Sequence, residues 1–125
     1  MAHIVYIEDD AADYAVLART LSDTRHTLHH FYDIKDFAGN APAAFSLIIS
    51  DLRLPGSYGF ETVERVRGLF PDVPLLVVTG MGGAYMTGDL IVGLMERGAH
   101  NVISKEILSD FHVLEIIDDL LSMGK

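Results

Sequence analysis

Short apolar runs that alternate with amphipathic stretches are the feature that most constrains how this chain folds. Residues 4–7, 47–50 and 75–78 are mostly apolar and carry no charge. A shorter run at 102–103 and a less regular one at 27–32 complete a set of five. Short uncharged runs of this kind are typical of strands that are buried on both faces, as in parallel sheets covered by helices.

Amphipathic segments between these runs predict a helix in each connection. The clearest lies between residues 14 and 21, where apolar side chains recur at the spacing of one helix face, and Asp10 is expected to cap its start. Gly98 is expected to end a later helix, because glycine is common just past a helix C-terminus. Further helices are predicted within residues 34–41, 59–70 and 89–97. We expect the last helix to be continuous and to bury one stripe of side chains: Ile107, Phe111, Leu114, Ile117 and Leu121.

The alternation of strands and helices implies a single α/β domain over residues 1–125. A chain of this length has the size of one ordinary domain. Right-handed crossovers between parallel strands place helices on both faces of the sheet. We therefore predict a doubly wound five-stranded parallel sheet.

The composition excludes several classes of protein. Eighteen acidic residues against nine basic ones give a net charge of −9, which argues against direct nucleic-acid binding and favours basic partners or bound cations. The chain has no cysteine, so disulfide and thiol chemistry are excluded. No apolar run is long enough to cross a membrane and no signal-peptide pattern is present, so we expect a cytoplasmic protein without membrane insertion.

Polar residues of a particular kind follow the predicted strands. The carboxyl ends of parallel strands meet at one edge of the sheet, where open α/β sheets bind their ligands. Carboxylates gathered there repel one another unless a cation lies between them, and oxygen ligands without histidine or cysteine suit Mg²⁺. A lysine and a threonine beside them are suited to hold phosphoryl oxygens and to neutralise their charge. The residues concerned are Glu8, Asp9, Asp51, Thr79 and Lys105.

This set of residues predicts phosphoryl transfer onto a carboxylate. Asp51 is the expected nucleophile because it is the single acid at the end of the central strand. Asp9 is expected to bind the metal ion directly, alongside Asp51, and Glu8 directly or through water. The carbonyl of Arg53, two residues past the nucleophile, is a candidate for a further metal ligand.

The same residues and their neighbours resemble the receiver domain of response regulators in two-component signalling. The resemblance implies a flavodoxin-like sheet of strand order 2-1-3-4-5. It also implies Mg²⁺-dependent transfer to Asp51 from a phosphohistidine, on a sensor histidine kinase or a histidine phosphotransfer protein, and altered binding of an unknown downstream protein. In the family, phosphorylation repositions the residues that match Thr79 and Lys105. The matching segments are Ile-Glu-Asp-Asp at 7–10, Ser-Asp-Leu-Arg-Leu-Pro-Gly at 50–56, Gly-Phe-Glu at 59–61, Val-Val-Thr-Gly at 77–80, Gly-Ala at 98–99 and Ser-Lys at 104–105.

Three positions depart from the family's pattern. Glu106 follows Lys105 where the family usually has a proline in a cis peptide. Since a cis bond before another residue costs about 2.5–4 kcal/mol, we expect a trans bond and a shifted lysine loop. Val102 stands where many receivers have a switching aromatic residue, so the usual threonine–aromatic switch cannot operate. The glycine-rich loop at 80–88 is longer than usual and is the expected place for unusual dynamics or partner contacts.

Two other functions fit parts of the pattern. A receiver-like module that signals by partner binding alone would keep the fold without the chemistry, and it need not bind Mg²⁺. A phosphatase acting through an aspartyl phosphate usually has a second acid two residues after the nucleophile, where this chain has Arg53. We therefore predict a domain that promotes its own phosphorylation and dephosphorylation and is not a turnover enzyme. The exposed side of the last helix is a candidate docking or homodimer surface.

Overall fold

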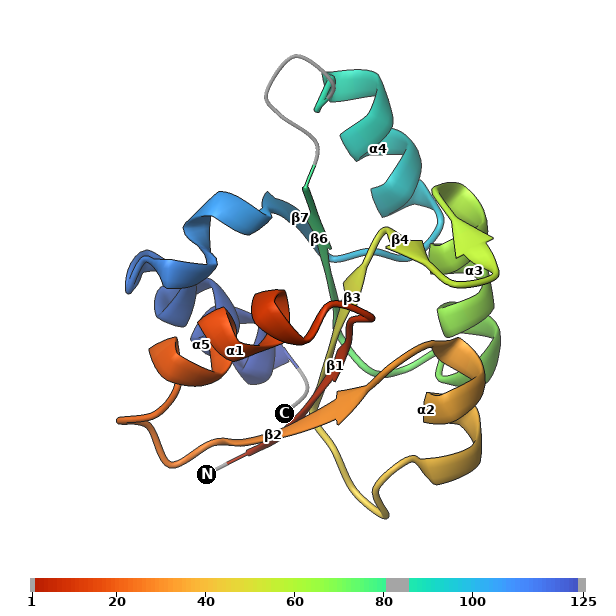
Figure 1. Cartoon of the computed structure of the whole chain (residues 1–125). Helices are drawn as coiled ribbons and strands as arrows, with labels where there is room; N and C mark the ends of the chain where they lie inside the picture. Colours follow the sequence, from red (N-terminus) through yellow and green to blue (C-terminus); the bar gives the residue numbers. More distant parts are fainter. Residues whose placement is uncertain (1, 81–85, 124–125) are drawn as a thin grey trace.

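The computed structural model describes residues 2–80 and 86–123, and it contains one five-stranded parallel sheet (Figure 1). The strand order is β2-β1-β3-β6-β7. Counted along the chain without the two short strands β4 and β5, this is the predicted order 2-1-3-4-5, so the predicted fold class is confirmed. The strands are β1 (His3–Ile7), β2 (Thr27–Phe31), β3 (Leu47–Asp51), β6 (Leu75–Thr79) and β7 (Asn101–Ser104).

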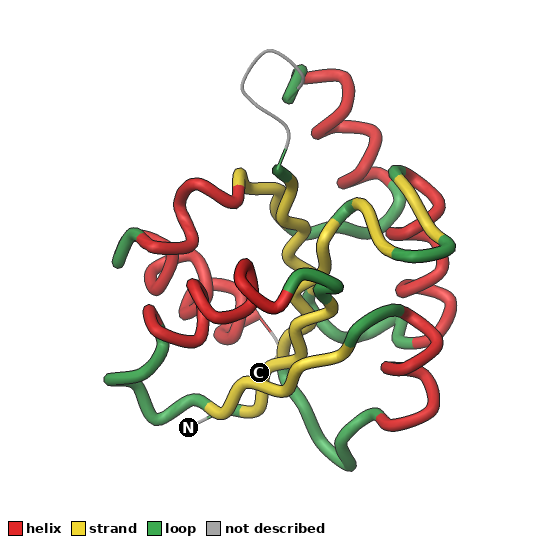
Figure 2. The backbone as a smooth tube through the Cα atoms, viewed as in Figure 1, coloured by secondary structure: helices red, strands yellow, loops and turns green. Residues whose placement is uncertain are grey.

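Helices cover both faces of the sheet, as Figures 1 and 2 show. Helices α1 (Ala11–Thr20) and α5 (His112–Met123) lie on one face. The opposite face carries α2 (Ile34–Asn40), α3 (Phe60–Leu69) and α4 (Gly88–Glu96). Among the described residues, no helix is long and apolar enough to span a bilayer.

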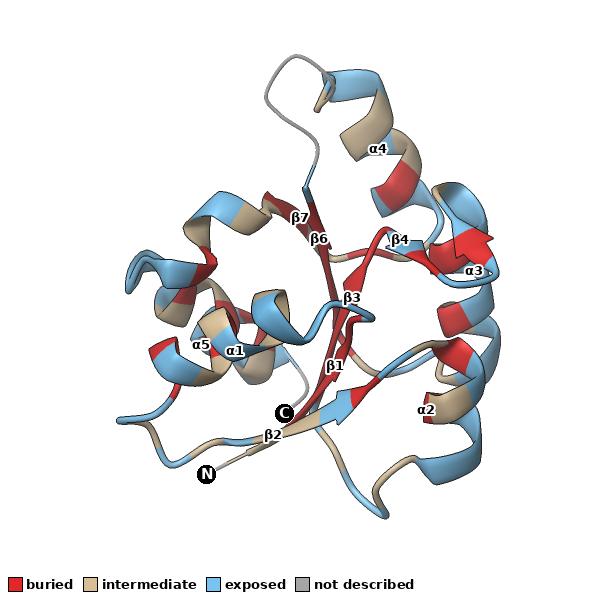
Figure 3. Ribbon diagram, in the orientation of Figure 1, coloured by how far each residue is buried: buried red, intermediate tan, exposed pale blue. Residues whose placement is uncertain are grey.

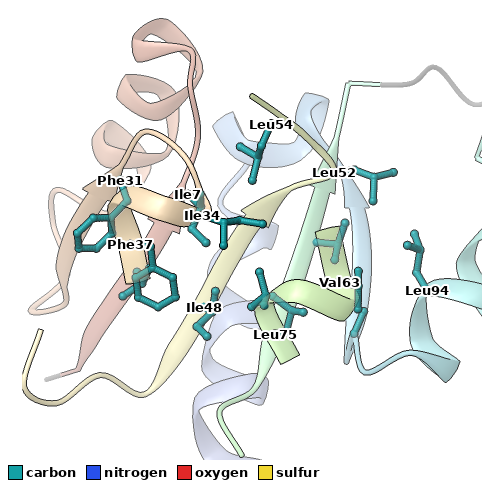
Figure 4. Close-up of a cluster of buried hydrophobic side chains, with 14 of the residues drawn as sticks. Ile7, Phe31, Ile34, Phe37, Ile48, Leu52, Leu54, Val63, Leu75 and Leu94 are labelled. Atoms are coloured by element: carbon teal, nitrogen blue, oxygen red, sulfur yellow. The ribbon is translucent and has the colours of Figure 1, made fainter. Parts of the chain in front are cut away.

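The sheet separates two hydrophobic cores, because successive side chains of a strand point to opposite faces. Val5 and Ile7 of β1 belong to the core under α2, α3 and α4, part of which Figure 4 shows. Ile4 and Tyr6 belong to the core under α1 and α5. Every residue of β3 and β6 is buried, as expected for the uncharged runs of the sequence (Figure 3).

Helix α1 begins where the sequence predicts. One carboxylate oxygen of Asp10 accepts hydrogen bonds from the backbone amides of Ala12, at 2.8 Å, and Asp13, at 3.3 Å. This satisfies two of the amides that a helix N-terminus leaves without partners inside the helix. Helix α4 ends close to its predicted position, with Gly98 following at a φ of 124°, a backbone conformation that favours glycine.

The prediction of one continuous last helix was wrong. A 3₁₀ helix, η1 (Lys105–Ser109), precedes α5, and the backbone of Asp110 between them is extended. The Asp110 carboxylate accepts a hydrogen bond of 2.9 Å from the His112 amide, and this local bond competes with helix continuation. Phe111 is consequently 70% exposed, and of the predicted stripe only Ile117 lies on the fully buried face of α5. The buried residues of α5 are Val113, Ile117 and Leu120.

The segment after β3 forms a small antiparallel hairpin that the sequence did not predict. It consists of β4 (Arg53–Leu54) and β5 (Ser57–Tyr58), and it turns at Gly56, whose φ is 79°. The Thr62 hydroxyl of α3 donates a 3.0 Å hydrogen bond to the Leu52 carbonyl. The residues that follow the strand end are therefore tied to α3.

Two of the predicted departures from the family pattern lie in described residues. The Lys105–Glu106 bond is trans, as expected. The Ser104 hydroxyl accepts a hydrogen bond of 3.2 Å from the Glu106 amide and so caps η1. Val102 is buried in the core under α2, α3 and α4. Of the loop at 80–88, residues 81–85 lie outside the described residues, while Met86 packs against that core.

Candidate functional site

A cleft lies at the carboxyl edge of the sheet, between the ends of β1, β3, β6 and β7. All six residues predicted for the site line it, so the strand ends bring them together as expected. The hairpin after β3 forms part of its wall. The lining residues are Glu8, Asp9, Asp10, Asp13, Asp51, Leu52, Arg53, Leu54, Pro55, Tyr58, Thr79, Gly80 and Lys105.

Three carboxylates converge in this cleft. Glu8 and Asp9 follow β1 directly, and Asp51 is the last residue of β3. One oxygen of each lies within 4.8 Å of the others, and two of the three residues are buried. Like charges held this close destabilise one another unless a cation lies between them, and an all-oxygen set of donors suits a hard divalent ion. The donor chemistry therefore fits Mg²⁺.

Glu8 has the most unusual environment of the three acids. Its side chain is fully buried, and one oxygen accepts hydrogen bonds from the Tyr6 hydroxyl, at 3.2 Å, while the other accepts from the Asp10 amide, at 3.1 Å. Burial, together with the negative charge of Asp51, raises the pKa of Glu8 to about 7, although Lys105 acts in the opposite direction. Near neutral pH this carboxyl is therefore part protonated when no metal ion is present.

Asp51 is held at both of its carboxylate oxygens. One accepts a 3.3 Å hydrogen bond from the Arg53 amide, and the other accepts a 2.9 Å hydrogen bond from the Lys105 ammonium. The side chain is 7% exposed and opens into the cleft. A carboxylate in this position is directed at whatever enters the cleft and has a cation beside it.

Lys105 reaches the site although the peptide bond that follows it is trans. Its ammonium contacts Asp51, Glu8 at 3.1 Å and Asp13 at 2.7 Å. Burial by itself lowers the pKa of Lys105, but the hydrogen bonds to Asp13 and Asp51 outweigh it, and the net pKa is raised. The lysine is therefore a fixed positive charge in the cleft.

Asp13 is the one member of this group that sequence reasoning missed. It lies in the first turn of α1, where an acidic residue is usually explained by the helix dipole. Its contact with Lys105 joins residues 92 positions apart in the chain. The only local signal is that Asp13 follows Asp9 by four residues, in the first turn of the helix that begins at Ala11.

Thr79 and Arg53 complete the predicted set. Thr79 is the last residue of β6, next to β3 in the sheet, and it is buried at the edge of the cleft. The Arg53 side chain is exposed, with its guanidinium 5.6 Å from the centre of the Tyr58 ring. Only the backbone of Arg53 is directed at the acceptor, because its amide donates a hydrogen bond to the Asp51 carboxylate.

Comparison with known proteins identifies the family. A sequence model described as "Response regulator receiver domain" matches residues 4–117. The chain belongs to the response-regulator receiver family. The strand order, the acidic cluster and the lysine at the end of β7 are thus features of a receiver domain.

Relatives of known name are larger proteins. The transcriptional regulatory protein FixJ of Bradyrhizobium diazoefficiens is 31% identical over 109 residues, which cover 86% of this chain and 51% of FixJ. The response regulator protein FleR of Pseudomonas aeruginosa is 33% identical over 109 residues, which cover 83% of this chain and 21% of FleR. The receiver domain described here thus spans between about a fifth and a half of these relatives.

Solved structures share the fold. The signal receiver domain of an HD domain-containing protein from Pseudomonas fluorescens has a TM-score of 0.83 and 22% identity, covering 98% of this chain and 96% of that one. Full-length FixJ from B. japonicum has a TM-score of 0.81 and 27% identity, covering 99% of this chain and 59% of that one. The first of these likenesses concerns the fold alone.

Proposed function

We propose that this receiver domain accepts a phosphoryl group on Asp51 from a phosphohistidine, with Mg²⁺ bound beside it, and that this modification switches partner binding. The proposal takes residues 1–125 as one receiver domain in the cytoplasm. The observation that carries it is the environment of Asp51, which has the Lys105 ammonium at 2.9 Å and two further carboxylates converging on the same space.

The groups around the acceptor support this transfer. An oxygen of Asp51 attacks the phosphorus in line, and the phosphorus–nitrogen bond to the donor imidazole breaks, with the electron pair leaving on nitrogen. Lys105 and Thr79 neutralise charge on the phosphoryl oxygens during transfer. Attack of water on the phosphorus later releases phosphate and restores the carboxylate. The domain thereby promotes its own modification and its reversal and is not a turnover enzyme.

Four residues are proposed to hold the metal ion: Asp9 and Asp51 directly, Glu8 directly or through water, and Arg53 through its carbonyl. Bound there, Mg²⁺ would supply positive charge to the transferring group and orient its oxygens. The convergence of three carboxylates within 4.8 Å supports this assignment for the acids. The Arg53 carbonyl is supported by the position of Arg53 on the cleft wall.

The donor is proposed to be a sensor histidine kinase or a histidine phosphotransfer protein, and the downstream protein is unknown. Thr79 is the last residue of β6 and Lys105 directly follows β7, and these strands precede α4 and, through η1, α5 in the chain, so α4 and α5 are the proposed places where a movement of these two residues is read. Val102 has no aromatic ring, so an aromatic side chain at this position cannot move together with Thr79. FixJ is named a transcriptional regulatory protein, but the charge of −9 supports a protein partner for this chain and argues against direct contact with nucleic acid.

The proposal is tested by incubating the protein with acetyl phosphate and Mg²⁺ and measuring its intact mass. We expect a gain of one phosphoryl group that is absent in Asp51→Asn and in the presence of a metal chelator. A phosphoryl gain that persists in Asp51→Asn would assign the acceptor elsewhere, and no gain with any donor would refute the proposal.

The departures at Glu106 and Val102 favour a second candidate, a receiver that signals through partner binding alone. It is distinguished by a Mg²⁺ titration followed by tyrosine fluorescence or NMR. Binding of Mg²⁺ in the acidic cleft favours the phosphoacceptor, whereas no response to Mg²⁺ favours the binding module.

A further inference from the structure

The Lys105 ammonium is shared among three carboxylates. Its contacts are 2.7 Å to Asp13, 2.9 Å to Asp51 and 3.1 Å to Glu8. An ammonium has three N–H donors, so each carboxylate takes one. The shortest of the three contacts is the one to Asp13, and the ion pair is largely removed from solvent on the lysine side, which is 19% exposed.

Asp13 differs from the other two partners of Lys105. Glu8 and Asp51 belong to the cluster of converging carboxylates, and each has a proposed role as metal ligand or acceptor. Asp13 lies outside that cluster, on the first turn of α1, with its side chain 37% exposed. Its contact with Lys105 is therefore separate from the roles proposed for metal binding and for phosphoryl acceptance.

A second contact ties the same segment to α1. The Thr20 hydroxyl, in the last turn of α1, donates a 2.6 Å hydrogen bond to the Leu108 carbonyl of η1, and this bond is buried. The first turn of α1 thus holds Lys105 at the start of η1, and the last turn holds η1 near its end. Figure 1 shows α1 beside the segment that joins β7 to α5. Helix α1 therefore fixes the position of the lysine, whose following peptide bond is trans.

We propose that Asp13 is a positioning residue that holds the Lys105 ammonium on the α1 side of the cleft and competes for it with a phosphoryl group on Asp51. This inference rests on the proposed function. A phosphoryl oxygen needs one N–H of the lysine, and each of the three is already engaged. The carboxylate of Asp13 also adds a negative charge close to the incoming anion. Both effects oppose phosphoryl binding, so their removal strengthens it.

The test compares Asp13→Asn with the unmodified protein. Beryllium trifluoride with Mg²⁺ stands in for the phosphoryl group, and its affinity is measured by NMR, alongside the rate of labelling by acetyl phosphate. Since a charged hydrogen bond at a half-exposed position is modest in strength, we expect Asp13→Asn to raise both by about three- to tenfold. Asp23→Asn is the matched control: it makes the same change in net charge at an exposed residue beyond the other end of α1, and a less than about twofold effect is expected.

A double-mutant cycle separates action through Lys105 from a general charge effect. In a Lys105→Gln background, Asp13→Asn is expected to have a clearly smaller effect than in the unmodified protein. An equal gain in both backgrounds, or unchanged or weaker binding in a folded Asp13→Asn, overturns the inference and leaves the proposed function intact. Failure of the unmodified protein to bind beryllium trifluoride overturns both, and the two failures are thereby told apart.

Discussion

With Glu8 in the proposed metal site, its buried carboxyl should make Mg²⁺ binding depend on pH in a calculable way. Its pKa is raised to about 7, because burial and the charge of Asp51 disfavour the ionised form. A metal ligand must be ionised to bind. With this pKa, Glu8 is about nine-tenths ionised at pH 8 and about one-tenth ionised at pH 6. The apparent affinity for Mg²⁺ should therefore fall about tenfold between pH 8 and pH 6, or about 1.4 kcal/mol.

The stability of the metal-free protein should change in the opposite sense. Because the pKa of Glu8 is higher in the folded state than its ordinary value of 4.5, the folded state binds the proton more tightly than the unfolded state. The resulting stabilisation is fully present below pH 4.5 and is lost as the pH rises to about 7. Mg²⁺ should then restore more stability at pH 8 than at pH 6.

Isothermal titration calorimetry at pH 6, 7 and 8, at constant ionic strength, measures the affinity directly. Glu8→Gln is the decisive variant, since it keeps the shape of the side chain and removes its titration. We expect weaker binding in Glu8→Gln and an almost flat pH profile. Equal affinity of the unmodified protein at pH 6 and pH 8 would refute the reasoning, as would a tenfold change that persists in the variant.

Three predictions concern stability and are measured by urea denaturation. Thr20→Val keeps the shape of the side chain but leaves the buried Leu108 carbonyl without its hydroxyl donor, and it should lower the free energy of unfolding by about 1–3 kcal/mol. Thr27→Val, at an exposed strand position, is the control and should change it by less than about 0.5 kcal/mol. Equal losses in the two variants would contradict the role given to the hydrogen bond. Gly98→Ala should cost about 1–3 kcal/mol, because its φ is 124° and an added Cβ would lie 2.5 Å from the side chain of Arg67. Gly39→Ala, in α2 with no atom within 4 Å of the new Cβ, should instead stabilise the protein by about 0.5–1 kcal/mol.

The central part of the fold was predictable because burial on both faces leaves a plain mark in the sequence. The uncharged runs at 47–50 and 75–78 became β3 and β6, whose residues are all buried. The site was predictable for a related reason. Once the strands are parallel, the residues that follow them must meet at one edge, and Asp51 and Lys105 do so at 2.9 Å.

What the sequence did not reveal depends on competition between local bonds or on distant contacts. The break between η1 and α5 follows from the Asp110 carboxylate, which caps a new helix where the apolar spacing favoured continuation. The hairpin after β3 depends on Thr62 reaching back to Leu52, a contact with no periodic pattern. Asp13 shows the limit most clearly, since its partner is 92 residues away and its position follows only from the docking of α1.

Because two contacts join α1 to η1, binding of a partner to the outer surface of α1 could change how the cleft binds a phosphoryl group. If Asp13 and the phosphoryl group compete for Lys105, any protein that binds α1 and displaces Asp13 from the lysine changes the affinity of the cleft for the phosphoryl group. Thermodynamic linkage then requires that phosphorylation changes the affinity of that partner for α1 by the same factor. A partner that binds α1 in this way would therefore both sense the modification of Asp51 and change the affinity of the cleft for the phosphoryl group, without contacting Asp51 or Lys105.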